Sequence, residues 1–416
     1  MNLARIKRNL SAAFLPGKAP HFYLDSPHVI PGKPHEATSP LHVSGWVIPP
    51  AGRAVRALEV LIEGQLVARM SGRGYRPRVA RVFPGRAGAL RSGFSAEVVL
   101  DRWMDRTAEM TVVVDYGDDP YVLTKIPLRV ERRVGEEPRR ARSFQLDDLL
   151  ACPDCQASEL DIGPDRVRCN HCGAAYDALR GTPLFAAPGI PIPSRLLETH
   201  FTHPYSQDSE EIIHRCKEGV VLDFGAGHPH PDRWHPNVLL HEAVHYNQID
   251  VVSVTPRLPY RDNCFDAIIS QAVFEHIPRP WEVASELHRV LKPGGQIHID
   301  TAFMQPFHSD PNHFFNMTLS GLREIFRPFR EVRAGVKPYQ LPSFGLRMQL
   351  GVMLEHMASG SWRDRMQALL GELERDGSAL DTALDPDGQT YLAAGVYFHG
   401  AKEPVWTVSA PGGAQA

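Results

Sequence analysis

The sequence predicts a multidomain protein with an amino-terminal β-sandwich, a small cysteine-rich module and a carboxyl-terminal doubly wound α/β domain. Short alternating stretches between residues 41 and 130 are separated by Gly, Pro and Asp turns, which is typical of a sandwich. Two C-x-x-C pairs follow. From residue 220, strand and helix patterns alternate, which is typical of a parallel sheet. We expect domain bounds of 1–140, 146–185 and 195–405.

The length and composition of the chain are typical of a soluble protein with several domains. The chain has 416 residues, more than one core usually serves, with 43% hydrophobic and 22% charged residues. Residues 1–150 carry 23 Lys and Arg against 16 Asp and Glu, a net +7, while the remainder carries 22 against 32, a net −10. The basic part could meet anionic glycan, lipid headgroups or RNA, although a solvated arginine face has the same pattern.

The α/β domain opens with an apolar strand at 220–222 that ends at Asp223. Gly225 and Gly227 follow in a turn, where glycine permits positive φ or close approach of a ligand. An ordinary glycine turn would look the same. Pro229 stands where a third glycine often sits, so a helix directly behind the turn is less assured.

An acid follows the second strand of this domain. Glu242 lies seventeen residues beyond Gly225, after the apolar residues 238–240. Dinucleotide folds place a carboxylate near this position to bind ribose hydroxyls. A solvated acid is the alternative, because His241 and His245 make the segment polar.

Further elements continue the α/β pattern. We expect a strand at 265–270, a helix over 280–291, a helix stop at 292–295 and a strand at 296–301. Residues 340–386 have helical spacing and are expected to form an insertion before the last strand.

Three motifs follow one another in the α/β domain: D-x-G-x-G at 223–227, an LP…FD segment at 258–266 and RVLKPGG at 289–295. Together they resemble the class I S-adenosylmethionine-dependent methyltransferases, in particular the methyltransferase type 11 group. The resemblance covers 220–329, with an antiparallel last strand at 391–399. It implies a Rossmann-like fold with a mostly parallel seven-stranded sheet. A nicotinamide dehydrogenase would share the glycine loop but not the other two motifs.

The resemblance also implies roles for individual residues, with S-adenosylmethionine as cofactor. Gly225 and Gly227 would lie under its methionine part and Asp223 would hold its amino group. Glu242 would bind the ribose and Leu258 would flank the adenine, while Ser270 or Gln271 would line the methionine side. The family often has another acid before the LP turn, but residues 253–255 are Ser, Val and Thr.

An oxygen acceptor must also lose its proton, and histidine is the usual base because its unperturbed pKa is ~6.5. Candidates are His276, after the fourth strand, and the His308, Asp310, His313 and Asn316 cluster after the fifth. Aromatic residues interleave with this cluster, as in the wall of a substrate pocket. A packed histidine at 276 and a metal site at the cluster are the alternatives.

The cysteine-rich module has the spacing of a zinc ribbon. Cys152 and Cys155 are separated by thirteen residues from Cys169 and Cys172. Four thiolates close a tetrahedral structural zinc site, with no position left for a catalytic water. Disulfides are the alternative. The segment resembles the small zinc-ribbon proteins that serve as methyltransferase partners.

Residues 41–130 resemble a β-sandwich module found beside bacterial glycosyltransferases and sugar-modifying enzymes. This resemblance points to a glycan acceptor, although a dimerisation or spacer module is an alternative. The sequence therefore predicts O-methylation of a sugar or cell-envelope glycan precursor. RNA or protein methylation, and a non-catalytic scaffold with a degenerate methyltransferase fold, remain alternatives.

No apolar run reaches the ~18 residues that a membrane-spanning helix needs, which predicts a cytoplasmic protein. Residues 1–17 have the pattern of a short basic amphipathic helix, so peripheral membrane contact is a further hypothesis.

Overall fold

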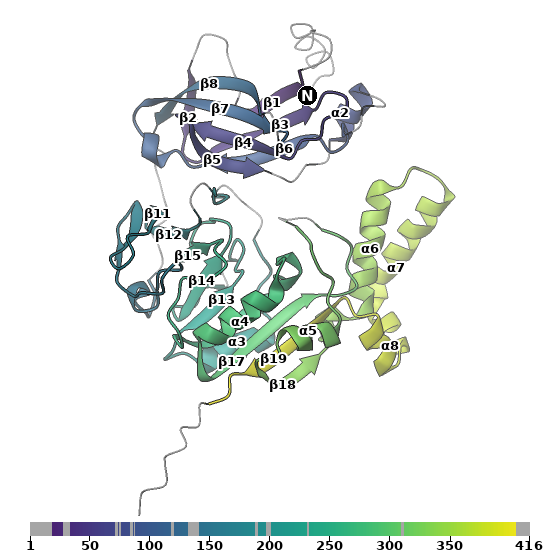
Figure 1. The fold of residues 1–416 in the computed structure, drawn as a ribbon. Coiled ribbons are helices and arrows are strands. Elements are labelled where there is room, and N and C mark those ends of the chain that lie inside the picture. The colour runs from purple at the N-terminus through teal and green to yellow at the C-terminus, as the bar shows by residue number, and fades with distance from the viewer. Residues whose placement is uncertain are drawn as a thin grey trace, which may run out of the picture. The chain divides into compact units, whose positions relative to one another are not determined.

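The computed structural model describes residues 19–27, 34–70, 74, 76–83, 86, 88–117, 120–131, 141–187, 190–196, 201–230, 233–308 and 312–404. The chain divides into two compact units (Figure 1). The first consists of residues 1–138, 188–199 and 244–247, and the second of the rest. The hypothesis of a membrane-binding helix at 1–17 falls outside the described residues. Within the described part of the chain, no helix is long and apolar enough to cross a bilayer.

The first unit contains two sheets. One is antiparallel, in the order β1 (His21–Ser26), β3 (Leu41–Ile48), β6 (Gly93–Val98). The other has the order β2 (His35–Thr38), β8 (Tyr121–Glu131), β7 (Thr107–Asp115), β4 (Ala57–Ile62), β5 (Gln65–Met70). Two short helices, α2 (Pro77–Val82) and η1 (Asp101–Trp103), complete it. Val47 of β3, Val60 of β4 and Ile126 of β8 are fully buried in one cluster. The two sheets therefore share one hydrophobic core.

The second unit is built on one eleven-stranded sheet. Its order is β18 (Arg330–Gly335), β19 (Gly395–Ala401), β17 (Leu291–Ala302), β16 (Phe265–Gln271), β13 (Val221–Phe224), β14 (Val238–Glu242), β15 (Val251–Ser253), β12 (Thr182–Phe185), β11 (Ala175–Leu179), β10 (Arg166–Cys169), β9 (Leu160–Ile162). Five neighbouring strands of this sheet, β17, β16, β13, β14 and β15, run parallel to one another. Strand β19 is antiparallel to β17.

The sheet has four strands more than the seven expected, because the cysteine-rich segment joins its edge. Strand β12 pairs in parallel with β15, with Leu184 beside Val252 and Phe185 beside Ser253. An uncovered edge strand presents unpaired backbone groups, and β12 satisfies those of β15. The segment expected to be a separate module at 146–185 is thus part of the second unit.

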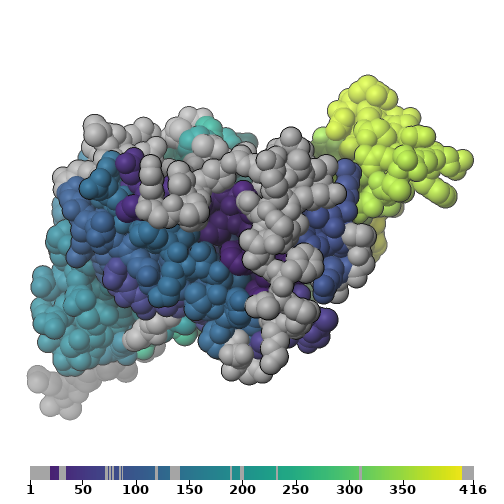
Figure 2. All heavy atoms as spheres, turned by 90° about the horizontal axis from the view of Figure 1, so that it is seen from above, coloured from purple at the N-terminus to yellow at the C-terminus, as the bar shows by residue number. Residues whose placement is uncertain are grey.

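The helices of the second unit are α3 (Gln207–Arg215), α4 (Pro280–Val290), α5 (Leu319–Ile325), α6 (Pro342–His356), α7 (Ser361–Ala383) and α8 (Pro386–Tyr391), with short turns η2 (Leu146–Asp148), η4 (Phe274–His276) and η5 (Pro338–Gln340). Helices α6 and α7 pack together (Figure 1), and this part of the chain forms the yellow-green lobe of Figure 2. The last strand begins at Gly395 rather than 391, because Asp385 caps α8 by accepting a hydrogen bond from Gly388 N.

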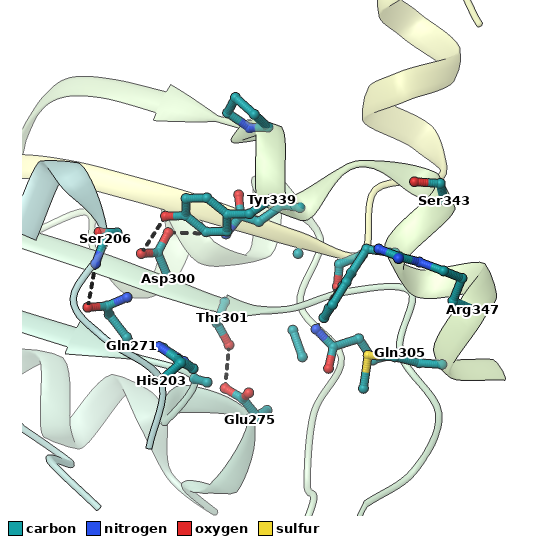
Figure 3. Close-up of a pocket in the computed structure, with 18 of the residues that line it drawn as sticks. His203, Ser206, Gln271, Glu275, Asp300, Thr301, Gln305, Tyr339, Ser343 and Arg347 are labelled. Atoms are coloured by element: carbon teal, nitrogen blue, oxygen red, sulfur yellow. Dashed lines mark hydrogen bonds between the residues drawn. The ribbon is translucent and has the colours of Figure 1, made fainter. Parts of the chain in front are cut away.

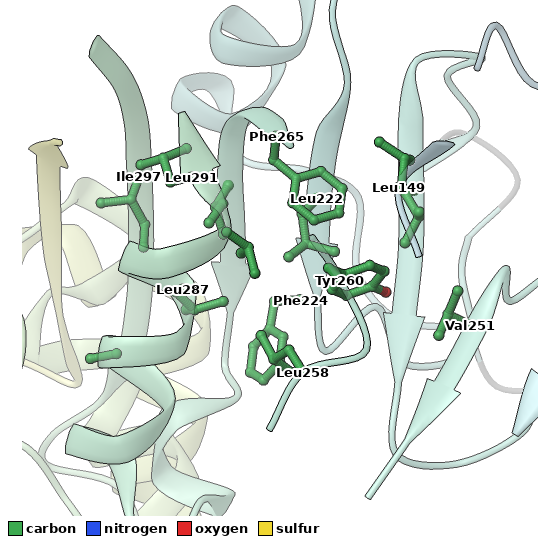
Figure 4. Packing of buried hydrophobic residues seen from close by; sticks show 14 of the residues in the cluster. Leu149, Leu222, Phe224, Val251, Leu258, Tyr260, Phe265, Leu287, Leu291 and Ile297 are labelled. Atoms are coloured by element: carbon green, nitrogen blue, oxygen red, sulfur yellow. The ribbon is translucent and has the colours of Figure 1, made fainter. Parts of the chain in front are cut away.

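One hydrophobic cluster extends across the second unit (Figure 4). Leu222, Phe265 and Leu287 are fully buried at its centre. Val167 and Tyr176 of the cysteine-rich segment belong to the same cluster. Burying a side chain of this size stabilises a fold by about 1.5–3 kcal/mol. The cysteine-rich segment is therefore held by shared core as well as by strand pairing.

Candidate functional site

The glycine turn lies where β13 and its neighbour β14 end. Phe224 pairs with His241, and the backbone N–H groups of Gly225 and Ala226 both donate to His241 O, at 2.9 and 3.0 Å. Gly225 and Gly227 have φ of +82° and +63°. A Cβ at Gly225 would lie 2.3 Å from Val273 Cγ2. Only glycine fits this turn without strain, because an L side chain rarely adopts positive φ.

Glu242 lies directly beside this turn. Its Oε2 accepts a hydrogen bond from Gly227 N at 2.7 Å, and its Oε1 accepts one from Ala243 N at 2.7 Å. Glu242 and the glycine turn thus lie at one corner of the sheet. The first was expected to hold a ribose and the second to lie under the methionine part of the cofactor. Open α/β sheets bind their ligands at such carboxyl ends.

Asp223 is buried at the end of β13 and has partners within the protein. Tyr205 Oη donates to its Oδ2 at 2.7 Å, and Arg233 Nη1 lies 3.5 Å from the same atom. Burial raises the pKa of Asp223, while Arg233 and the Tyr205 hydrogen bond oppose that rise. Neither Tyr205 nor Arg233 belongs to a motif that sequence reasoning could have found.

Residues 201–206, here called the covering segment, lie over the glycine turn. Thr202 donates to His228 O from its backbone N at 2.9 Å and from Oγ1 at 3.0 Å. A Cβ at Gly227 would lie 2.4 Å from Thr202 Cγ2. Arg233 Nε donates to His203 O at 2.8 Å. The covering segment is therefore packed and hydrogen-bonded onto the turn.

A cavity of about 670 Å³ opens beside the ends of β16 and β17 (Figure 3). Its polar lining residues include Gln271, Glu275, Asp300, Gln305, Tyr339, Gln340, Ser343 and Arg347. Of the residues expected to contact the cofactor, Gln271 lines this cavity. Gln271 Oε1 accepts from Ser206 N at 3.3 Å, so the covering segment borders this cavity too.

The helical insertion contributes polar groups to this cavity. Tyr339 Oη and Gln340 Nε2 both donate to the Asp300 carboxylate at 3.1 Å. Burial and the nearby Asp300 raise the pKa of Tyr339, so it remains a neutral donor. Sequence reasoning treated this region as an insertion and missed these residues, because their proximity to Asp300 depends on the tertiary fold.

The three histidines predicted as candidate bases lie together. The His276 ring is 4.9 Å from that of His308 and 5.9 Å from that of His313, centre to centre, and His308 and His313 are 4.3 Å apart. Phe307 stacks on His313 at 5.9 Å. Asp310 lies outside the described residues.

Hydrogen bonds distinguish the three rings. His313 Nδ1 accepts from His308 N at 3.3 Å, and its Nε2 lies 3.1 Å from Phe315 O and 2.9 Å from Asn316 Oδ1. Both nitrogens of His313 are thus engaged, which argues against its role as a base. His276 Nδ1 and His308 Nδ1 each face a carbonyl, Asn312 O at 2.5 Å and Pro306 O at 3.1 Å. Their Nε2 atoms therefore carry the lone pair.

Two residues expected to contact the cofactor, Ser270 and Leu258, are buried and have hydrogen-bond partners within the protein. Ser270 is fully buried and its Oγ donates to Phe224 O at 2.8 Å, which ties β16 to β13. Leu258 is 5% exposed within the core, and its backbone N donates to Glu286 Oε2 at 2.9 Å. The side chains of both are therefore buried within the second unit, which the family resemblance did not reveal.

The four cysteines of the two C-x-x-C pairs meet as one cluster. Cys152 Sγ is 3.7 Å from Cys172 Sγ, and Cys155 Sγ is 3.6 Å from Cys169 Sγ. A disulfide requires about 2.05 Å. Sulfurs around a tetrahedral zinc with bonds of about 2.3 Å lie about 3.8 Å apart. The arrangement thus fits a zinc ion and not two disulfides. Burial raises the pKa of Cys169, but the Cys172 and His171 backbone N–H groups lower it, to about 7.

Comparison with known proteins bears on the second unit. Residues 235–299 match the family described as a methyltransferase domain. An uncharacterised methyltransferase of Mycobacterium tuberculosis is 43% identical over 51 residues, which are 12% of this chain and 20% of the relative. One from Mycobacterium leprae is 41% identical over 77 residues, 18% of this chain and 28% of the relative. The chain thus spans under a third of the length of these curated relatives.

A solved structure gives a weaker likeness. A putative sarcosine dimethylglycine methyltransferase from Galdieria sulphuraria is 18% identical, over 47% of this chain and 83% of its own, with a TM-score of 0.30. A TM-score this low does not establish a shared fold. The match over 235–299 supports a methyltransferase domain in the second unit, and it includes Glu242 and His276.

Proposed function

We propose that the second unit is an S-adenosylmethionine-dependent methyltransferase. The observation that carries the proposal is the Glu242–Gly227 hydrogen bond at the carboxyl ends of β13 and β14. A carboxylate beside a glycine turn is the arrangement that nucleoside-binding α/β sheets use for ribose. Glu242 also lies inside the segment that matches a methyltransferase domain.

In this proposal the cofactor binds at the ends of β13, β14 and β16. Glu242 accepts hydrogen bonds from the ribose diol, and the two glycines let the methionine part approach the backbone. Gln271 directs an amide from the end of β16 toward the same side. Because the covering segment packs on Gly227 through Thr202, we expect it to shift when the cofactor enters.

The acceptor would occupy the 670 Å³ cavity beside β16 and β17. Its wall combines carboxylates, amides and the Arg347 guanidinium, which suit a polar molecule with several hydroxyl groups. A sulfonium already activates its methyl group, so the protein mainly aligns the acceptor. We therefore propose O-methylation of a sugar or cell-envelope glycan precursor, with His276 or His308 near the acceptor oxygen.

We assign the four clustered cysteines to a structural zinc ion. A zinc there would hold β9 to β12 in shape and so support the edge of the sheet at β15. We further propose that the first unit is a β-sandwich module that binds the acceptor. A basic module could also bind RNA or anionic lipid, and co-purification of nucleic acid would favour the RNA alternative.

One observation favours a second candidate, a binding protein without catalytic activity. Asp223 is already held by Tyr205 and Arg233, and the covering segment is hydrogen-bonded onto the glycine turn. A degenerate fold that no longer admits the cofactor would show the same contacts.

Isothermal titration calorimetry with S-adenosylmethionine separates the two candidates. The enzyme proposal expects one molecule bound per chain, with affinity about 10- to 100-fold lower in Glu242→Ala, because hydrogen bonds to a charged group contribute about 1.5–3 kcal/mol. The matched control is Glu331→Ala, an exposed acid on β18. Absence of binding to the folded protein, or equal affinity in both variants, would contradict the proposal.

The acceptor class has its own test. The protein, methyl-labelled cofactor and fractionated lysate of the host would be incubated together, with Arg347→Ala as a cavity variant. We expect label in a carbohydrate-containing fraction and a higher KM for that acceptor in Arg347→Ala. Label in RNA or protein would overturn the glycan assignment.

A further inference from the structure

We propose that Glu275, His276 and His308 form a binding site for a divalent transition-metal ion at the edge of the cavity. One ligand atom from each lies within 4.8 Å of the other two. Glu275 and His276 belong to η4, directly after β16, and His308 comes from the loop after β17. Two neighbouring strand ends thus supply a carboxylate and two imidazoles.

The two histidines are oriented as metal ligands usually are. A ligating histidine commonly donates its other ring N–H to a backbone carbonyl, which sets the tautomer and the direction of the free nitrogen. His276 Nδ1 faces Asn312 O at 2.5 Å, and His308 Nδ1 faces Pro306 O at 3.1 Å. In both rings Nε2 is then the atom free to bind an ion.

Glu275 supplies the negative charge. It is 1% exposed, and its Oε2 accepts a hydrogen bond from Thr301 Oγ1 at 2.9 Å, as Figure 3 shows. Among the described residues, no Lys or Arg forms an ion pair with it. A buried carboxylate is costly unless paired or bound to a metal. An ion held by the two histidines would compensate this charge.

The surrounding backbone holds the carboxylate and the loop together. Phe314 N donates to Glu275 O at 2.7 Å, which ties η4 to the chain after residue 311. His313 accepts from His308 N and so supports the second ligand rather than binding the ion itself. Backbone contacts therefore orient the three ligands of the site.

The donor set selects the class of ion. Two imidazoles and a carboxylate suit Zn²⁺, Mn²⁺, Fe²⁺, Co²⁺ or Ni²⁺, whereas Mg²⁺ and Ca²⁺ prefer oxygen ligands throughout. Ligands with bonds of about 2.1 Å lie roughly 3.0–3.4 Å apart. The three ligand atoms lie within 4.8 Å of one another, so small χ rotations bring them to this spacing.

Such an ion keeps coordination positions open, since the described residues supply three ligands. In the proposed enzyme these positions would bind two neighbouring oxygens of the acceptor, such as a vicinal diol, because Glu275 also lines the cavity. This consequence rests on the proposed function, whereas the metal site itself does not.

A competing cluster provides the control. Glu210, His214 and His235 also place ligand atoms within 4.8 Å of one another. However, the His214 side chain is 72% exposed, whereas Glu275 is 1% exposed. We therefore assign the ion to the cluster at Glu275.

The test is metal content and Co²⁺ spectroscopy of the full-length protein. We expect two equivalents of bound metal in the wild type and one in Cys152→Ser. The ion left in Cys152→Ser should show weak d–d bands as Co²⁺ without thiolate charge transfer. Adding His276→Ala or Glu275→Gln to Cys152→Ser should remove it, while adding His214→Ala should not.

Circular dichroism of each variant checks that it is folded, and His308→Ala serves as a replacement if one variant unfolds. A Cys152→Ser protein without bound metal, or a metal lost with His214→Ala instead, would overturn the site. Calorimetry with S-adenosylmethionine on Cys152→Ser, which keeps Glu275, His276 and His308, tells the two proposals apart. If Cys152→Ser binds the cofactor but no metal ion, this site alone is refuted. If it binds the metal ion but no cofactor, the proposed function alone is refuted.

Discussion

Gly227 donates its backbone N–H to the Glu242 carboxylate at 2.7 Å, across fifteen residues of sequence. The contact exists because β13 and β14 are parallel neighbours, so the turn after one strand meets the residue that ends the other. It joins the glycine turn and Glu242, which taken alone could be an ordinary turn and a solvated acid. Together they form the corner of the sheet on which the proposed cofactor site depends.

Gly227→Ala should destabilise the protein by about 1–3 kcal/mol more than Gly294→Ala. Both glycines have positive φ, so both variants incur backbone strain, but a Cβ at Gly227 would lie 2.4 Å from Thr202 Cγ2 and one at Gly294 meets open space. Urea unfolding of the two variants measures the difference. Equal losses would show that the covering segment does not pack on the turn.

Tyr205→Phe should lower the free energy of unfolding by about 1–3 kcal/mol, because buried Asp223 loses a hydrogen-bond donor. Tyr391→Phe is the control, since Tyr391 is 69% exposed at the end of α8. Chemical denaturation followed by tryptophan fluorescence compares them. A Tyr205→Phe protein as stable as the control would contradict the stated role of this contact.

Acid should destabilise the second unit between pH 6.5 and about 3. Burial lowers the pKa of His241 from 6.5 to about 3 and that of His399 to about 4. A depressed histidine pKa contributes stability above pH 6.5, and that stability is lost as pH falls, because the unfolded chain binds the proton first. Each such group contributes a slope of up to about 1.4 kcal/mol per pH unit.

The variant His241→Asn should flatten this slope, measured as the free energy of unfolding at several pH values. His214→Asn, at an exposed ring, is the control. An unchanged slope in His241→Asn would mean that His241 is not held neutral beside Tyr260, whose Oη lies 2.7 Å from its Nδ1.

Cys152→Ser should release the zinc ion that we propose for the cysteine cluster and loosen the edge of the sheet. Hydrogen exchange should then accelerate in β12, which pairs with β15. Cys216→Ser is the control, because Cys216 lies outside the cluster. The measurement is hydrogen exchange with mass spectrometry before and after chelation. Protection of β12 that does not respond to chelator would contradict a structural ion.

Much of the second unit could be predicted from local sequence patterns. The strand expected at 265–270 is β16, and the helix expected at 280–291 is α4. These elements follow from hydrophobic spacing, which acts over a few residues. The first residue of the last strand was wrong, because α8 extends to Tyr391, where a strand was expected to begin.

The candidate site could be predicted only in part. His276, His308 and His313 were predicted as candidate bases because they follow strand ends, but their hydrogen bonds depend on carbonyls of the folded loop. The family resemblance implied that Ser270 lines the methionine side, and in the structure its hydroxyl donates to Phe224 O. Tyr339 and Arg347 had no local signal.

The sequence by itself determined the elements and the chemistry at their ends: the glycine turn, Glu242, the histidines and the four paired cysteines. Only the tertiary structure decided which of these meet. It joined β12 to β15, laid residues 201–206 on the glycine turn and brought Glu275 to His308. The physical reason is separation along the chain. Propensity and periodicity depend on residues close in sequence, whereas these contacts depend on how strands and loops far apart in sequence pack together.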